Sequence, residues 1–128
     1  MRLLLDTHIL LWLAGNDPRL PKTVLQLVED TRNTLVFSAA SMWEIAVKRS
    51  RGRPDFPHDA PVIRQALLDA GYQELAIDSH HAMASTELPK IHGDPFDRIL
   101  IAQAQLGGMV LVTADQTVAR YPGAIKLV

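Results

Sequence analysis

The sequence contains no cysteine, which excludes a disulfide scaffold, a cysteine-ligated zinc site and a thiol nucleophile. It has no apolar run near the ~18 residues that a membrane-spanning helix requires. The apolar run at the N-terminus reaches Asp6 at once, so we expect no signal peptide and a cytoplasmic protein. The formal net charge of −1 excludes a strongly basic nucleic-acid-binding protein but not a local basic patch.

The composition is that of a folded globular protein. Hydrophobic residues make up 48% of the 128 positions and charged residues 21%, which excludes a disordered chain. A domain usually needs ~100–200 residues, so the length favours one domain over residues 1–128.

Short apolar runs alternate with stretches of helical periodicity along the whole chain. Runs of this kind predict strands near residues 3–5, 35–37, 74–77, 109–112 and 125–128. Buried strands that alternate with helices are typical of a parallel sheet covered on both faces. We therefore expect an α/β fold: a three-layer α/β/α sandwich with a central parallel sheet of four to five strands.

Acidic residues follow the predicted strands. Asp6 comes directly after the first run, Glu44 lies in the first helical turn after the second, and Asp115 follows the fourth. Asp94 and Asp97 open the most apolar helix. The carboxyl ends of parallel strands share one edge, where such sheets bind their ligands, so these carboxylates are expected to converge there.

Each acid also has a purely structural interpretation. Asp6, Asp94 and Asp115 can each cap a helix, and Ser41 and Glu44 have the spacing of a capping box. Taken together, however, converging carboxylates repel, by about 4 kcal/mol for each pair at ~4 Å in an effective dielectric near 20. A bound divalent cation offsets that repulsion, and Mg²⁺ prefers oxygen ligands. Carboxylate-held Mg²⁺ suits phosphoryl chemistry.

The remaining candidates are basic or aromatic. A basic cluster beyond Glu44 fits either phosphate attraction or a solvated helix end; it comprises Lys48, Arg49, Arg51 and Arg53. Arg98 fits phosphate contact or bracing of the acids. Trp12 and Trp43 fit core packing better than base stacking. No histidine pair has metal-binding spacing, and His8 can line the site, contact RNA or pack in a first helical turn.

Four ordered motifs resemble those of PIN-domain ribonucleases, and most closely the VapC toxins of toxin–antitoxin pairs. The motifs are Leu5-Asp6-Thr7-His8 with Leu11-Trp12-Leu13, Ser41-x-Trp43-Glu44-Ile45, Asp94-Pro95-Phe96-Asp97-Arg98 with Ile101-Ala102-Gln103-Ala104, and Val112-Thr113-x-Asp115. The resemblance covers essentially the whole chain, in order.

The resemblance implies a PIN-like fold and a Mg²⁺-dependent or Mn²⁺-dependent ribonuclease. Asp6, Glu44 and Asp97 match the central acidic site, Asp115 the fourth metal-binding acid, and Thr113 the hydroxyl residue that steadies the site. Asp94 belongs to the motif as a helix cap or a supporting group. The resemblance also implies a homodimer, an RNA substrate and a small antitoxin partner.

Three other functions are compatible with parts of the pattern. A phosphotransfer enzyme of similar architecture fits poorly, because its Asp-x-Asp motif is replaced by Asp6-Thr7-His8. A non-catalytic interaction module leaves the acidic set unexplained. A PIN nuclease that processes RNA or DNA outside a toxin–antitoxin pair differs from the toxin only in its substrate and partner.

Overall fold

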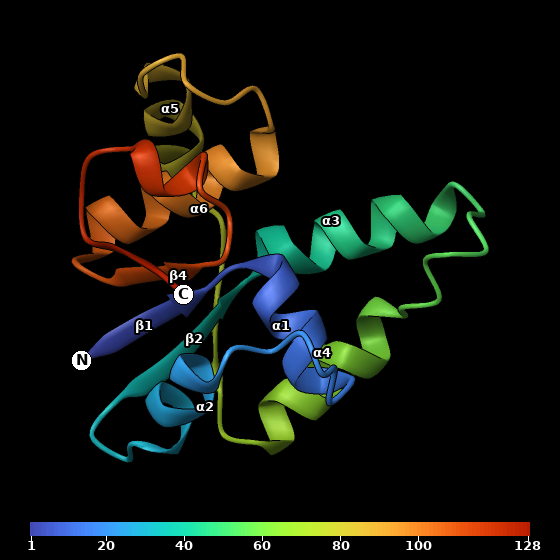
Figure 1. The fold of residues 1–128 in the computed structure, drawn as a ribbon. Helices are drawn as coiled ribbons and strands as arrows, with labels where there is room; N and C mark the ends of the chain where they lie inside the picture. The colour runs from blue at the N-terminus through green and yellow to red at the C-terminus, as the bar shows by residue number, and fades with distance from the viewer.

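A computed structural model describes residues 1–128 (Figure 1). Five strands form one sheet in the order β3-β2-β1-β4-β5, and every neighbouring pair is parallel. The strands are β1 (Arg2–Leu5), β2 (Thr34–Ser38), β3 (Gln73–Leu75), β4 (Val110–Thr113) and β5 (Ile125–Leu127). The helices are α1 (Thr7–Ala14), α2 (Lys22–Glu29), α3 (Ala39–Ser50), α4 (Ala60–Asp69), α5 (Ser79–Glu87), α6 (Pro95–Gly107) and the short 3₁₀ helix η1 (Val118–Arg120).

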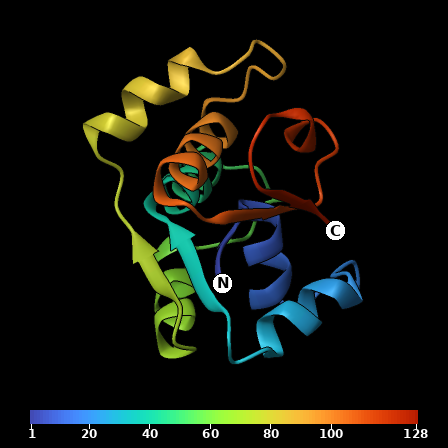
Figure 2. The same ribbon diagram turned by 90° about the vertical axis from the view of Figure 1, so that its left-hand side faces the viewer.

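The helices cover both faces of the sheet, which confirms the predicted three-layer α/β/α sandwich. Figure 2 shows α5 and α6 on one side of the strands and α1, α2 and α4 on the other. The side chains of β1 explain this arrangement: Leu3 and Leu5 pack into the core under α1 and α4, whereas Leu4 packs against α6. A strand buried on both faces needs apolar residues at every position, and this strand has them.

The order of the strands creates a crevice at the carboxyl edge of the sheet. From the central β1 the chain moves to β2 and β3 on one side, and later returns to β4 and β5 on the other. The two directions part between β1 and β4, the place where open parallel sheets bind ligands. Asp6 follows β1 and Asp115 follows β4, so both acids flank this point.

Two local predictions are wrong. Helix α3 begins at Ala39, and the hydroxyl of Ser38 accepts from the Ala40 N–H at 3.0 Å. Glu44 therefore lies beyond the first turn in which it was expected, and the alternative Ser41–Glu44 capping box does not form. Trp43, expected in the core, is 54% exposed and packs edge-on against Phe96.

No helix combines the length and the apolar character needed to cross a bilayer.

Candidate active site

Asp6 is buried where β1 ends, with 5% of its surface exposed. One carboxylate oxygen caps α1 by accepting from the Ile9 N–H at 3.1 Å, and the other accepts from the hydroxyl of Thr113. Burial raises the pKa of Asp6, and the negative charge of Glu44 raises it further, although the hydrogen bonds from Thr113 and Ile9 oppose the rise. The capping interpretation of Asp6 is therefore correct, and the charge of Glu44 acts on the same carboxylate.

Thr113 links Asp6 to the segment that carries Asp115. Its buried hydroxyl donates to Asp6 and accepts from the Asp115 N–H at 3.0 Å. The carboxylate of Asp115 accepts from the N–H groups of Thr117 and Val118 at 2.8 and 3.4 Å. Asp6 and Asp115 line one cavity of about 220 Å³, so the two acids share a solvent-filled space at the edge of the sheet.

Glu44 lies in α3 with only 3% of its surface exposed. Its Oε1 accepts from the Thr7 hydroxyl at 2.7 Å, and its Oε2 accepts from Lys48 Nζ at 2.6 Å. The Thr7 hydroxyl also lies 3.0 Å from Ser41 Oγ. A buried carboxylate needs such partners, because an unpaired buried charge is strongly destabilising. Thr7 comes from α1, one residue after Asp6, and thus ties Glu44 to the end of β1.

Asp97 lies in the first turn of α6, after the N-cap Asp94, which accepts from the N–H groups of Phe96 and Asp97 at 2.8 and 3.3 Å. Burial raises the pKa of Asp97 to about 7, and the charges of Asp94, Glu44 and Asp6 add to the rise, against a hydrogen bond from His92. The negative charges of Asp6, Glu44 and Asp97 therefore act on one another although the three residues are far apart in sequence.

His92 is a site residue that the sequence analysis missed. Its Nε2 lies 2.9 Å from Asp97 Oδ2. The ligand atoms of His92, Asp94 and Asp97 all lie within 4.8 Å of one another, and they are the one group of three such side chains that converges this closely. The pairing joins a loop to the helix that follows it, at no recurring spacing, so no local pattern could have revealed it.

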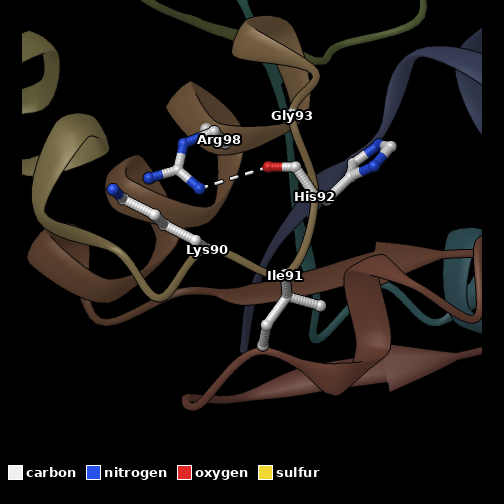
Figure 3. Close-up of a pocket in the computed structure, with 5 residues that line it drawn as sticks. All are labelled: Lys90, Ile91, His92, Gly93 and Arg98. Carbon is white, nitrogen blue, oxygen red and sulfur yellow. Dashed lines mark hydrogen bonds between the residues drawn. The ribbon is translucent and has the colours of Figure 1, made fainter.

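The backbone of His92 is held on both sides. Its N–H donates to the hydroxyl of Tyr121 at 2.7 Å, and its carbonyl accepts from that hydroxyl at 3.1 Å and from Arg98 Nη1 at 3.2 Å. Figure 3 shows the Arg98 guanidinium aimed at this carbonyl while the imidazole points the other way. Arg98 also donates to the carbonyls of Ser85, Leu88 and Pro89, so it braces the loop before α6.

The other predicted nucleic-acid contacts lie around the acids. His8 is exposed and lines the cavity of Asp6 and Asp115. Lys48 is engaged by Glu44, and Arg49 donates to the Pro57 carbonyl at 2.9 Å. Arg51 is exposed just beyond α3. Arg53 pairs with Asp55, so Arg51 is the one residue of this basic cluster whose side chain has no hydrogen-bond or ion-pair partner.

The carboxylates of the site and the imidazole of His92 fit a divalent cation by their chemistry. Carboxylate oxygens are the ligands that Mg²⁺ and Mn²⁺ prefer, and one imidazole is compatible with Mn²⁺. Burial and the charge of Asp94 raise the pKa of Asp97, so its ionised form is disfavoured in the metal-free protein. The ammonium of Lys48 is paired with Glu44. A cation between the acids would supply the missing charge.

The chain is thus a parallel α/β protein with buried carboxylates at the carboxyl edge of its sheet. It belongs to the PIN-domain family, whose sequence model matches residues 3–124. The family resemblance predicted from the four motifs is therefore confirmed. Among curated proteins, none matches the sequence.

Several solved structures share the fold over nearly their whole length. VapBC2 from Rickettsia felis, bound to a DNA fragment from its promoter, is 17% identical with a TM-score of 0.72, and the match covers 99% of this chain and 98% of that one. A toxin–antitoxin complex from Klebsiella pneumoniae is 21% identical, with a TM-score of 0.67 and coverages of 96% and 94%. DNA-bound VapBC from Salmonella typhimurium is 18% identical, with a TM-score of 0.66 and coverages of 98% and 97%.

The raised pKa of Asp97 predicts how stability varies with pH in a chelator. The pKa is 3.8 in the unfolded chain and about 7 in the folded protein, so between these values the folded state holds more protons. The contribution of Asp97 to the free energy of unfolding should therefore fall with rising pH across this window, by at most about 1.4 kcal/mol per pH unit, and level off above it. Urea unfolding at several pH values measures this.

Asp97→Asn provides the control for this pH dependence, because an asparagine cannot ionise. The difference in unfolding free energy between wild type and variant isolates Asp97 from the other titrating groups. We expect the unfolding free energy of the wild type to fall relative to that of the variant as the pH rises from about 4 to 7. Parallel curves for the two proteins would show that the folded structure leaves the pKa of Asp97 unchanged.

Proposed function

We propose that the chain is a divalent-metal-dependent endoribonuclease and the toxin of a toxin–antitoxin pair, formed by one domain over residues 1–128. The observation that carries this proposal is the position of three carboxylates in a PIN fold: Asp6 is buried where β1 ends, Glu44 is buried in α3, and Asp97 lies in the first turn of α6. Mg²⁺, or Mn²⁺ in its place, is the cofactor that this set of donors favours.

Asp6, Glu44, Asp97 and Asp115 would hold the cation. Once bound, Mg²⁺ would supply an activated water and neutralise charge on the departing oxygen of the RNA phosphodiester. The protein contributes the positioning: Thr113 fixes the carboxylate of Asp6. Thr7 and Lys48 hold Glu44, and His92 holds Asp97. Asp94 supports Asp97 as the cap of its helix.

The proposed partners follow from the similar structures. Three of these are described as VapBC or toxin–antitoxin complexes, which supports a small antitoxin as the protein partner. We also propose that the chain forms a homodimer and acts in the cytoplasm. The alternative is a PIN nuclease with an RNA-processing or DNA-processing role outside such a pair. Both versions use the same acidic site.

The direct test is cleavage of total bacterial RNA by the purified protein, with the ends of the products sequenced. Total RNA presents many sequences and folds, so an unknown recognition site is represented. We expect discrete cuts with Mg²⁺ or Mn²⁺ and none with excess chelator. The same preparation carrying Asp6→Asn controls for contaminating nucleases. Equal cleavage with chelator, or by this variant, would contradict the proposal, and cuts confined to DNA would favour the alternative.

A further inference from the structure

A second cavity adjoins the one that holds Asp6 and Asp115. It has a volume of about 190 Å³ and shares His8 and Trp12 with the acid-lined cavity. The two side chains therefore form a common wall between them. Its other lining residues come from α1, the turn after α1 and the loop before α4; they are Leu11, Asp17, Arg19, Asp55, Phe56 and His58.

Flat conjugated groups dominate the second cavity. The imidazole of His8 and the indole of Trp12 have centroids 6.3 Å apart, and Phe56 meets His58 edge-on at 5.0 Å. The guanidinium carbon of Arg19 lies 5.7 Å from the centroid of the Trp12 ring. Aromatic rings and guanidinium planes are the groups on which nucleobases stack in single-stranded nucleic-acid sites.

The cavity is charge-balanced, which suits a base better than a phosphate. Asp17 binds Arg19 through Nε and Nη2, at 3.1 and 2.8 Å. Asp55 is bound in the same way by Arg53, at 3.2 and 2.9 Å. Because each positive charge here already has a carboxylate partner, a phosphate would find no free cation. A neutral planar ring meets no such obstacle.

The walls of the cavity are held in place by the surrounding structure. Arg49 Nη1 donates to the carbonyl of Pro57, the residue between Phe56 and His58. Trp12 is half-buried and packs on the core beneath α1. A site that keeps its shape before the ligand arrives loses less conformational entropy on binding.

We propose that this second cavity binds one unpaired base of the RNA, next to the phosphate at the acidic site. The inference rests on the proposed ribonuclease function and adds to it a defined site for the base that lies beside the cut. A base within a duplex is already stacked on its neighbours and cannot enter. Trp12 is the main stacking surface, and its position in the shared wall couples base binding to the placement of the phosphate.

Trp12 can report on base binding directly, because the chain has only one other tryptophan. In a Trp43→Phe background its fluorescence is followed during titration with a ten-nucleotide unstructured RNA, in chelator so that no cleavage occurs. We expect this RNA to quench the emission, and an otherwise identical RNA with abasic sugars to bind without quenching. Equal signals from the two RNAs, or no quenching at saturation, would overturn the inference.

A kinetic comparison tests the consequence for the reaction. Trp12→Leu should raise KM for single-stranded RNA about tenfold, which corresponds to about 1.4 kcal/mol for the loss of one stacked base, with kcat within about twofold. Trp12→Phe should restore most of the loss. Trp43→Leu is the matched control, because Trp43 lines neither cavity. An unchanged KM in folded Trp12→Leu overturns the inference. If the wild type does not cleave RNA, the proposed function is contradicted instead. The fluorescence titration then still shows whether the second cavity binds a base.

Discussion

Asp97→Asn should lower RNA cleavage by at least about a hundredfold. The proposed cation contributes several kcal/mol of transition-state stabilisation, and each 1.36 kcal/mol corresponds to a tenfold rate change. Asparagine keeps the size of Asp97 but removes the negative charge that would bind the cation. Single-turnover cleavage of a defined RNA, in saturating Mg²⁺, measures the effect.

The same substitution should stabilise the protein when no divalent ion is present. Burial and the charge of Asp94 disfavour the ionised form of Asp97, and an uncharged side chain avoids that cost. At pH 8 in chelator, we expect Asp97→Asn to unfold at a higher urea concentration than the wild type. Activity and stability would then change in opposite directions, which a simple folding defect cannot produce.

Asp78→Asn is the matched control for Asp97→Asn. Asp78 is also an aspartate at a helix N-terminus, where it accepts from the His81 N–H at 3.1 Å, but it is exposed and lies outside the acidic site. Because asparagine is an equally good N-cap, this variant should keep its activity. If Asp78→Asn lost as much activity as Asp97→Asn, or if the latter cut RNA at the wild-type rate, the assigned role of Asp97 would be wrong.

The sheet and its order of elements could be predicted because their determinants are local. Leu3, Leu4 and Leu5 are all fully buried, and an uninterrupted apolar run is the pattern that a two-sided strand requires. The start of α6 was equally readable, since Asp94 accepts from the first free N–H groups and Pro95 occupies the first helical turn. In each case one short segment contains all the information.

The start of α3 was not readable, because two serines compete for one role. Ser38 and Ser41 are both good N-caps in isolation, and the end of β2 decides between them. Once Ser38 caps the helix, Glu44 lies further along it and its carboxylate is free to meet Thr7. The shift of the cap thus removes the capping-box alternative for Glu44, which lies buried and bonded to Thr7.

Trp43 was misassigned for a related reason. An aromatic residue among apolar neighbours usually faces the core, but here α3 runs outward from the end of β2 and the side chain lies largely in solvent (Figure 1). The partner of Asp97 was equally hidden, because His92 reaches it across the turn into α6. The ion pair of Glu44 with Lys48 was also missed, although the i,i+4 spacing of the two residues is a signal that could have indicated it.

Lys48→Met should destabilise the metal-free protein by about 1–3 kcal/mol, because it leaves the carboxylate of Glu44 buried without its cation. Removal of one partner from a fully buried ion pair costs ~3–5 kcal/mol, and the figure here is lower because the Lys48 side chain is 32% exposed. Methionine keeps the apolar stem of the lysine. Urea unfolding in chelator measures the loss, with exposed Arg51→Met as a control that should change little.

Glu44→Gln in the Lys48→Met background completes the double-mutant cycle. The glutamine keeps an oxygen for the Thr7 hydroxyl but has no charge to neutralise, so the double variant should recover most of the lost stability. Mg²⁺ should also stabilise Lys48→Met more than the wild type, because a bound cation would replace the missing ammonium. Additive losses from the two substitutions would show that the Lys48–Glu44 pair contributes no coupling energy, and that Glu44 is held at the acidic site by Thr7 alone.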